Sequence, residues 1–139
     1  MAALSITAAN VIWQSGDIDK DQVAGEAFIA GAMVYKAANG TWLKAQSDGT
    51  AIEAGSEDLG MALFTADVAA ARGSIAKPGA VVAIGAGTAG VPYFVGPTAG
   101  SLNPIADIAS TGKVTMAAVG IGSNKVQLAR VYNAGAVVP

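Results

Sequence analysis

The stretch that decides the fold is VVAIGAGTAGVPYFVG, residues 81–96, in which two short apolar runs flank a glycine-rich segment. It belongs to a longer window, residues 78–106, that contains no charged residue. A membrane-spanning helix needs about 20 apolar residues in regular helical backbone. This window instead carries four prolines and six glycines, which divide it into short pieces. It therefore predicts short strands joined by turns, and we expect no membrane partner.

Similar short runs recur along the rest of the chain. In residues 125–132, Val126 and Leu128 alternate with Gln127 and Ala129, as expected for a strand buried on one face. Asn39-Gly40, between two such runs, is the strongest hairpin signal in the sequence. The candidate strands are residues 6–14, 27–29, 33–37, 41–45, 60–64, 81–84, 91–95, 113–121 and 125–132.

Only residues 66–72 favour a helix. They are rich in alanine, Thr65 precedes them as a candidate N-cap, and Gly73 follows them. Two helical turns at most would be marginal without packing. The turn signals recur at short intervals throughout, so we predict an all-β fold, a compact β-barrel or β-sandwich, with at most one or two short helices.

The length of 139 residues favours one domain, at roughly 150 residues per domain. No segment has the composition of a linker, so residues 23–139 are predicted to form a single β domain. Residues 1–22 precede it, either as an N-terminal arm or as the first strand. The first seven residues lack the positively charged start of a secretory signal, and none is expected.

The composition excludes several classes of function. The chain contains no Cys and no His, so it has no disulfide framework, no thiolate or imidazole metal site, and no Cys-His or Ser-His catalytic pair. Its eight basic residues are scattered from Lys20 to Arg130 and form no basic stripe, so nucleic acid is not an expected partner. The ten acidic residues mostly stand in turn-like segments and suggest no facing pair. We predict that the protein is not an enzyme.

Two motifs resemble ligand sites, but each lacks residues or structure that such a site needs. The segment 85–90, GAGTAG, matches the dinucleotide fingerprint, but a strand-like segment with Pro92 follows it where a helix must begin. Asp17, Asp19 and Asp21 alternate as in a calcium loop, but the glycine and glutamate that such a loop also needs are missing. We interpret this second segment as a solvated loop, and we predict neither a cofactor nor a bound metal.

The larger aromatic side chains are expected to pack in the core or at its rim. Tyr35 with Trp42 is the only pair that would suit stacking against a sugar. Trp13 is not expected to pack in the core, because it precedes the main body of the domain and is followed by Gly16. It is predicted to anchor the N-terminal segment on a neighbouring molecule.

The surface is expected to be weakly charged. Hydrophobic residues make up 53% of the chain and charged residues only 13%, against about 25% in an ordinary soluble domain. Eighteen charged side chains cannot cover a domain of this size, so small and aliphatic residues must be exposed. A weakly charged surface of this kind favours packing against copies of the chain or against a lattice, which indicates a structural role.

From residue 23 onward, the order of motifs resembles the capsid decoration proteins of tailed phages, also called cement or head-stabilisation proteins. The motifs are AGEAFIAGAMVY at 24–35, NGTWLKA at 39–45, GMAL at 60–63 and VGIG at 119–122. The resemblance covers about residues 23–132 and rests on glycines and strand residues, with no catalytic signature.

This resemblance implies a tulip-like β domain that binds the outside of a phage head and stabilises its lattice. The implied partners are the major capsid protein and further copies of the chain, arranged as a homotrimer. The implied location is the outer surface of the virion, after synthesis in the host cytoplasm. The alternative hypothesis is a β-sandwich binding module on a phage or cell surface, a carbohydrate-recognition or adhesin domain.

The N-terminal segment provides the candidate contact residues. Residues 2–13 alternate weakly as a strand and precede an acidic stretch that would suit a hinge. If they form an arm that adds a strand to a neighbour, then Ile6, Val11 and Trp13 are the apolar side chains that would contact the capsid or another subunit. An ordinary first strand of the domain is an equal alternative.

Overall fold

The computed structural model describes residues 4, 6–104, 113–122 and 124–133. Within them the chain forms two antiparallel sheets and one short 3-10 helix, at Ala8–Asn10. The first sheet has the order β1 (Ile12–Ser15), β7 (Val81–Ala83), β11 (Lys125–Asn133), β10 (Val114–Gly122), β8 (Pro92–Val95), β9 (Leu102–Asn103). The second has the order β2 (Ile18–Val23), β6 (Arg72–Ala76), β5 (Gly60–Ala62), β3 (Met33–Lys36), β4 (Trp42–Lys44).

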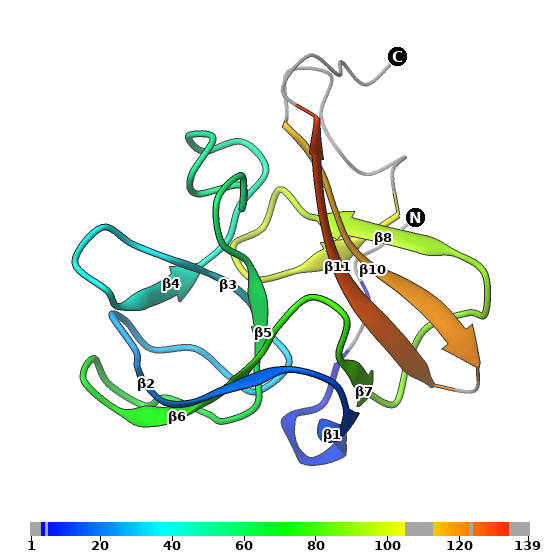
Figure 1. The fold of residues 1–139 in the computed structure, drawn as a ribbon, viewed down its shortest axis with the longest axis horizontal. Helices are drawn as coiled ribbons and strands as arrows, with labels where there is room; N and C mark the ends of the chain where they lie inside the picture. Colours follow the sequence, from blue (N-terminus) through cyan, green and yellow to red (C-terminus); the bar gives the residue numbers. More distant parts are fainter. Residues whose placement is uncertain (1–3, 5, 105–112, 123, 134–139) are drawn as a thin grey trace.

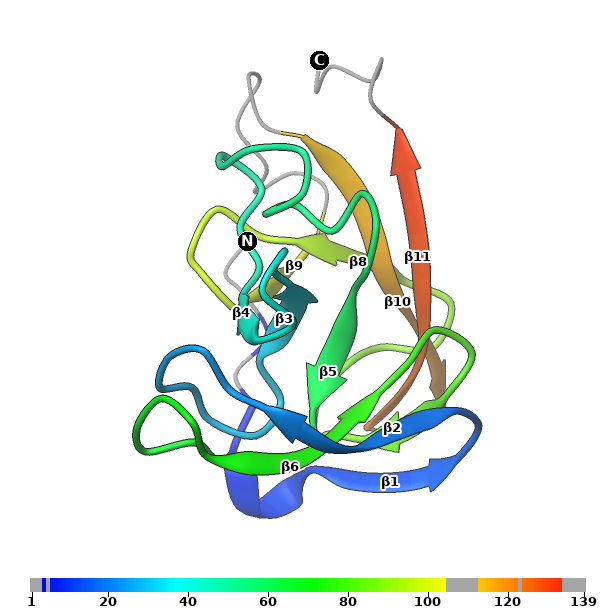
Figure 2. The same ribbon diagram turned by 60° about the vertical axis from the view of Figure 1, so that its left-hand side comes forward.

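The two sheets pack on each other as a sandwich. In Figures 1 and 2 the long hairpin of β10 and β11 forms one side, and the pair of β2 and β6 lies near the base. Among the described residues no strand pairing joins one sheet to the other, so the fold is a β-sandwich and not a closed barrel. The predicted all-β class is confirmed.

Two clusters of buried side chains hold the sandwich together. The larger lies between the sheets, with Met33 and Met61 from the second sheet against Val82, Val95 and Val126 from the first. The smaller covers the opposite face of the second sheet. There Trp42 and Ile75 pack against Phe28 and Ala66 from the loops. The second sheet is therefore buried on both faces, which explains why β3 and β5 lack an alternating pattern of burial.

The Asn39-Gly40 hairpin is confirmed. β3 and β4 pair with Lys36 opposite Trp42, and the Ala37 backbone N–H donates to the Thr41 carbonyl at 2.8 Å. Gly40 has φ +85°, the left-handed conformation that favours glycine. The Asn39 side chain accepts hydrogen bonds from the backbone N–H and the hydroxyl of Thr41. The turn chemistry read from the sequence therefore fixes this register.

The predicted helix at residues 66–72 is wrong. Ala66 forms a two-way backbone pair with Phe28, Ala70 has φ +74° and donates to the Ala24 carbonyl, and Arg72 already begins β6. Long-range backbone hydrogen bonds thus replace the local ones that a helix would need. Seven alanine-rich residues have too little intrinsic helical stability to compete with them.

The expected solvated loop at residues 17–21 is also wrong, because β2 begins at Ile18. Ile18 pairs with Ala76 and packs against the core between the sheets. The register shifts between Asp19 and Gln22, where Asp21 has φ +56°. This bulge interrupts the alternation, so the three aspartates do not form one continuous row.

The loop between β4 and β5 contains a local ionisable contact that predicts a pH effect. Glu53 accepts a hydrogen bond from the Thr50 backbone N–H at 2.8 Å, and its own N–H donates to the Thr50 hydroxyl. The pKa of Glu53 is lowered from 4.5, first by the backbone hydrogen bond and next by the Thr50 side chain. A carboxyl with a lowered folded pKa stabilises the fold above its unfolded pKa, and this contribution is lost as the pH falls through the folded value.

We therefore expect Glu53→Gln to be slightly less stable than the parent chain near neutral pH, and to lose less stability on acidification. Urea unfolding of both proteins at about pH 7 and about pH 3 measures how much stability each one loses on acidification. The Glu53 side chain lies at the surface, where solvent screens its charge, so the effect is small. Identical pH dependence in the two proteins would contradict the role assigned to the Thr50 contact.

Candidate functional site

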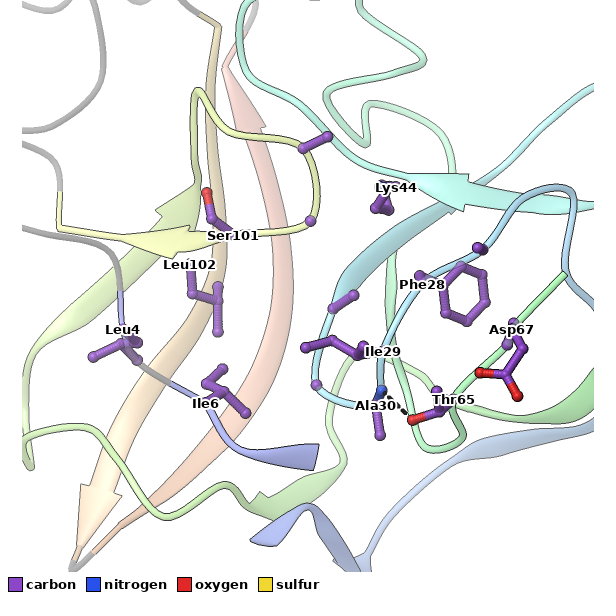
Figure 3. A pocket seen from close by; sticks show the side chains of 16 residues that line it. Leu4, Ile6, Phe28, Ile29, Ala30, Lys44, Thr65, Asp67, Ser101 and Leu102 are labelled. Carbon is purple, nitrogen blue, oxygen red and sulfur yellow. Dashed lines mark hydrogen bonds between the residues drawn. The ribbon is translucent and has the colours of Figure 1, made fainter. Parts of the chain in front are cut away.

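The described surface contains a groove of about 520 Å³. It runs between the segment 27–32 on one side and the start of the chain with β9 on the other, as Figure 3 shows. Most of its lining is apolar or small. The lining residues are Leu4, Ile6, Ala27, Phe28, Ile29, Ala30, Gly31, Ala32, Lys44, Thr65, Ala66, Asp67, Ala99, Gly100, Ser101 and Leu102.

One wall of the groove is the segment 27–32, and hydrogen bonds to distant residues fix its position. Phe28 exchanges both backbone hydrogen bonds with Ala66, at 3.0 and 2.8 Å. The Ala30 N–H donates to the Thr65 hydroxyl at 3.1 Å, drawn as a dashed line in Figure 3. A turn follows, in which the Ala32 N–H donates to the Ile29 carbonyl. This turn directs Ile29 outward, and the residue is 56% exposed.

The opposite wall combines the start of the chain with β9. The Leu4 N–H donates to the Leu102 carbonyl at 2.8 Å. Ile6 lies over Gly31, where a Cβ atom would come within 2.6 Å of the Ile6 Cγ2 atom. Leu4 and Ile6 are half-buried and pack against the core between the sheets. The groove thus depends on the absence of a side chain at position 31.

The groove carries little charge. Lys44 and Asp67 are its only charged lining residues, and among the described residues neither has an ion pair. The backbone N–H of Lys44 donates to the Glu26 carboxylate at 2.9 Å, which fixes the strand that carries the lysine. The Thr65 hydroxyl accepts from Ala30, and the Ser101 hydroxyl donates to the Thr98 carbonyl. Such a surface suits apolar contact with a partner, since its hydroxyls already have backbone partners.

The structure separates the three candidate contact residues. Ile6 lines the groove, and Val11 is half-buried near Gly31, where a Cβ atom would lie 3.1 Å from its Cγ2. Trp13 lies outside the groove, on the edge strand β1, and is 40% exposed. Ile6 and Val11 therefore meet at Gly31, whereas Trp13 belongs to a different surface. The predicted strand at residues 6–14 is also shorter than expected, because Ala8–Asn10 is a 3-10 turn.

Sequence reasoning missed Ile29 and Leu102 as groove residues. Ile29 follows Phe28 and precedes two small residues, and the sequence predicts only a strand at residues 27–29. Phe28 forms only an isolated bridge, and it packs edge-to-face on Phe64 with ring centroids 5.3 Å apart. The useful signal was Gly31, because a glycine directly after an apolar run indicates a turn that exposes the run's end.

The remaining sequence motifs lie outside the groove. The segment 85–90 connects β7 to β8, so no helix follows the glycine-rich loop. Tyr35 and Trp42, the candidate sugar-stacking pair, are 7% and 0% exposed. Across the described residues, no three or more carboxylates cluster as a metal site would require. Within the same ranges, no helix has the length and apolar character needed to cross a membrane.

Comparisons with models of protein families, with curated proteins and with solved structures find no match to this chain.

Proposed function

We propose that this protein is a non-enzymatic virion structural protein that binds the outside of a phage head and stabilises its capsid lattice. The observation that carries the proposal is the exposed apolar groove with Ile29 at its rim, on a chain with few charges. Its partners are the major capsid protein and further copies of itself, which the motif resemblance implies as a trimer. The order of motifs in residues 23–132 adds support for the phage head as the target.

The mechanism is the burial of apolar surface across the junction between capsid subunits. Each 100 Å² of apolar surface removed from water contributes roughly 2.5 kcal/mol before the costs of association. A groove with half-buried Leu4 and Ile6, exposed Ile29 and few charges loses little hydration when it is covered. Repeated at many lattice positions, such contacts resist separation of neighbouring subunits.

The aromatic pair that the sequence offers gives no support to the alternative of a carbohydrate-binding module. Sugar recognition of the stacking kind needs an exposed aromatic face. The pair that the sequence offered, Tyr35 and Trp42, is buried in the sandwich.

The test is co-sedimentation of the full chain with expanded heads of the phage that encodes it. We expect Ile29→Lys to reduce binding about tenfold or more, because the lysine must be desolvated in the contact. Val131→Lys is the matched control, since Val131 is 57% exposed on β11 and outside the groove. Both substitutions are on the surface, so both variants should keep their melting temperatures.

Equal binding by the two variants would exclude the groove as the contact. Failure of the parent chain to sediment with heads would overturn the proposed function itself.

A further inference from the structure

The four edges of the two sheets differ in how they are protected. An edge strand presents unpaired backbone N–H and C=O groups, and proteins usually block it with charges, bulges or covering chain. The edges are β1 and β9 in the first sheet and β2 and β4 in the second. Three of them are blocked and one is not.

The three blocked edges use different devices. β4 is covered by the chain at 24–26, where the Gly25 N–H donates to the Trp42 carbonyl at 2.8 Å. β9 is covered by Leu4, which donates to the Leu102 carbonyl. β2 carries Asp19, Lys20 and Asp21 together with the bulge.

β1 has none of these devices. It pairs with β7 on one side only, and among the described residues no other segment hydrogen-bonds to its second side. All four of its residues are exposed and uncharged, with Ile12 at 58% and Trp13 at 40%. Trp13 stands opposite Val82, which is fully buried, so Trp13 continues the core-facing side of the first sheet onto its exposed edge strand.

We infer that β1 is a docking strand for the β1 strand of a second copy of this chain, so that two first sheets join across a two-fold axis. Antiparallel pairing of identical strands is self-complementary, and an uncharged strand meets no like charge when it pairs with itself. A closed ring built by strand pairing would need two open edges per chain, and the described part of this one offers a single open edge. The contact does not rest on the proposed function, because it needs no capsid.

The pairing is expected to be weak and reversible. Four residues supply few backbone hydrogen bonds, and the contact area is far below that of a stable complex. The added energy comes from burying Ile12 and Trp13, so the association should persist at high salt. A dimer should therefore accumulate as the protein concentration rises over about a hundredfold range.

The test uses the full chain, which has no cysteine of its own. A single Gln14→Cys substitution places a thiol on β1, and a short bis-maleimide linker then joins two chains that meet there. The matched control is Ile52→Cys, since Ile52 is 44% exposed in the loop 46–59 at the opposite end from β1 in Figures 1 and 2. We expect rapid formation of covalent dimer with Cys at position 14, and at least tenfold slower formation with Cys at position 52.

Adding Ile12→Lys to the Gln14→Cys chain should remove this difference, because a charge on the edge opposes pairing. Equal cross-linking at the two positions, or a molecular mass that does not change with concentration, would overturn the inference. A trimer by light scattering without cross-linking through position 14 would overturn it as well.

Discussion

Replacing Trp42 with alanine should lower the free energy of unfolding by about 3 to 5 kcal/mol, the usual cost of removing a large aromatic side chain from a core. Trp42 is fully buried and belongs to the cluster on the outer face of the second sheet. Its indole Nε1 donates to the Gln22 Oε1 atom at 2.9 Å, which ties β4 to β2 across the sheet. The substitution removes the packing and leaves this polar partner without its donor.

A second contact adds to the expected loss. The Lys77 ammonium lies 5.0 Å from the centroid of the Trp42 ring, and it donates to Asp58 while Asp19 lies 3.7 Å away. The lysine therefore connects Trp42 on β4 with Asp19 on β2 and with Asp58 in the loop before β5. Without the ring, the ammonium loses a cation–π contact but keeps its carboxylate partners.

Trp13→Ala is the matched control, because the chain contains only these two tryptophans. Trp13 is 40% exposed on an edge strand, so its replacement should cost about 1 kcal/mol or less. Thermal and urea unfolding of both variants measure the difference, which corresponds to a melting temperature lower by roughly 10 °C for Trp42→Ala. The fluorescence of the Trp13→Ala variant should be blue-shifted, since its remaining indole is buried. Equal stability losses in the two variants would contradict the assignment of Trp42 to the core.

The parts of the fold that the sequence predicted are those encoded by neighbouring residues. Val126 and Leu128 are buried while Gln127 is exposed, as the alternation indicated. The Asn39-Gly40 turn lies where the sequence predicts it, in a three-residue loop between Ala37 and Thr41 whose last position, Gly40, takes the positive φ that such a loop needs. Local patterns of this kind recur along the whole chain and were enough to predict an all-β fold.

The parts that were missed depend on distant residues. β2 contains three charged residues and looks like a loop, yet it forms because Ile18 and Val23 meet β6 some fifty residues later in the chain. The groove has the same origin, since its walls are fixed by the pairs Phe28–Ala66 and Leu4–Leu102. No periodicity within a short window can show which distant backbone groups will pair. The sequence predicts Ile6 only as an apolar contact residue of the N-terminal segment, and its place in the groove wall comes from its contact with Gly31.

That contact gives the second large expected effect. Gly31→Ala should lower the free energy of unfolding by about 2 to 5 kcal/mol, from two causes that add. Gly31 has φ +94°, where an L-residue costs roughly 1 to 2 kcal/mol. Its new Cβ would also lie 2.6 Å from the Ile6 Cγ2 and 3.1 Å from the Val11 Cγ2, so the N-terminal segment must shift, at a further cost of about 1 to 3 kcal/mol.

Gly40→Ala separates the two causes. Gly40 has φ +85°, yet a Cβ there would meet nothing within 4 Å, so this variant carries the conformational cost without the overlap. Urea unfolding should therefore rank Gly31→Ala clearly below Gly40→Ala in stability. In the Gly31→Ala background, Ile6→Ala should cost less than it does alone, because it also relieves the overlap. Because Ile6 forms one wall of the groove, Gly31→Ala should also weaken binding to phage heads, whereas Gly40→Ala should leave that binding unchanged. If the two glycine variants were equally stable and bound heads equally well, Ile6 would not be held against Gly31, and the groove would lose the wall that the N-terminal segment provides.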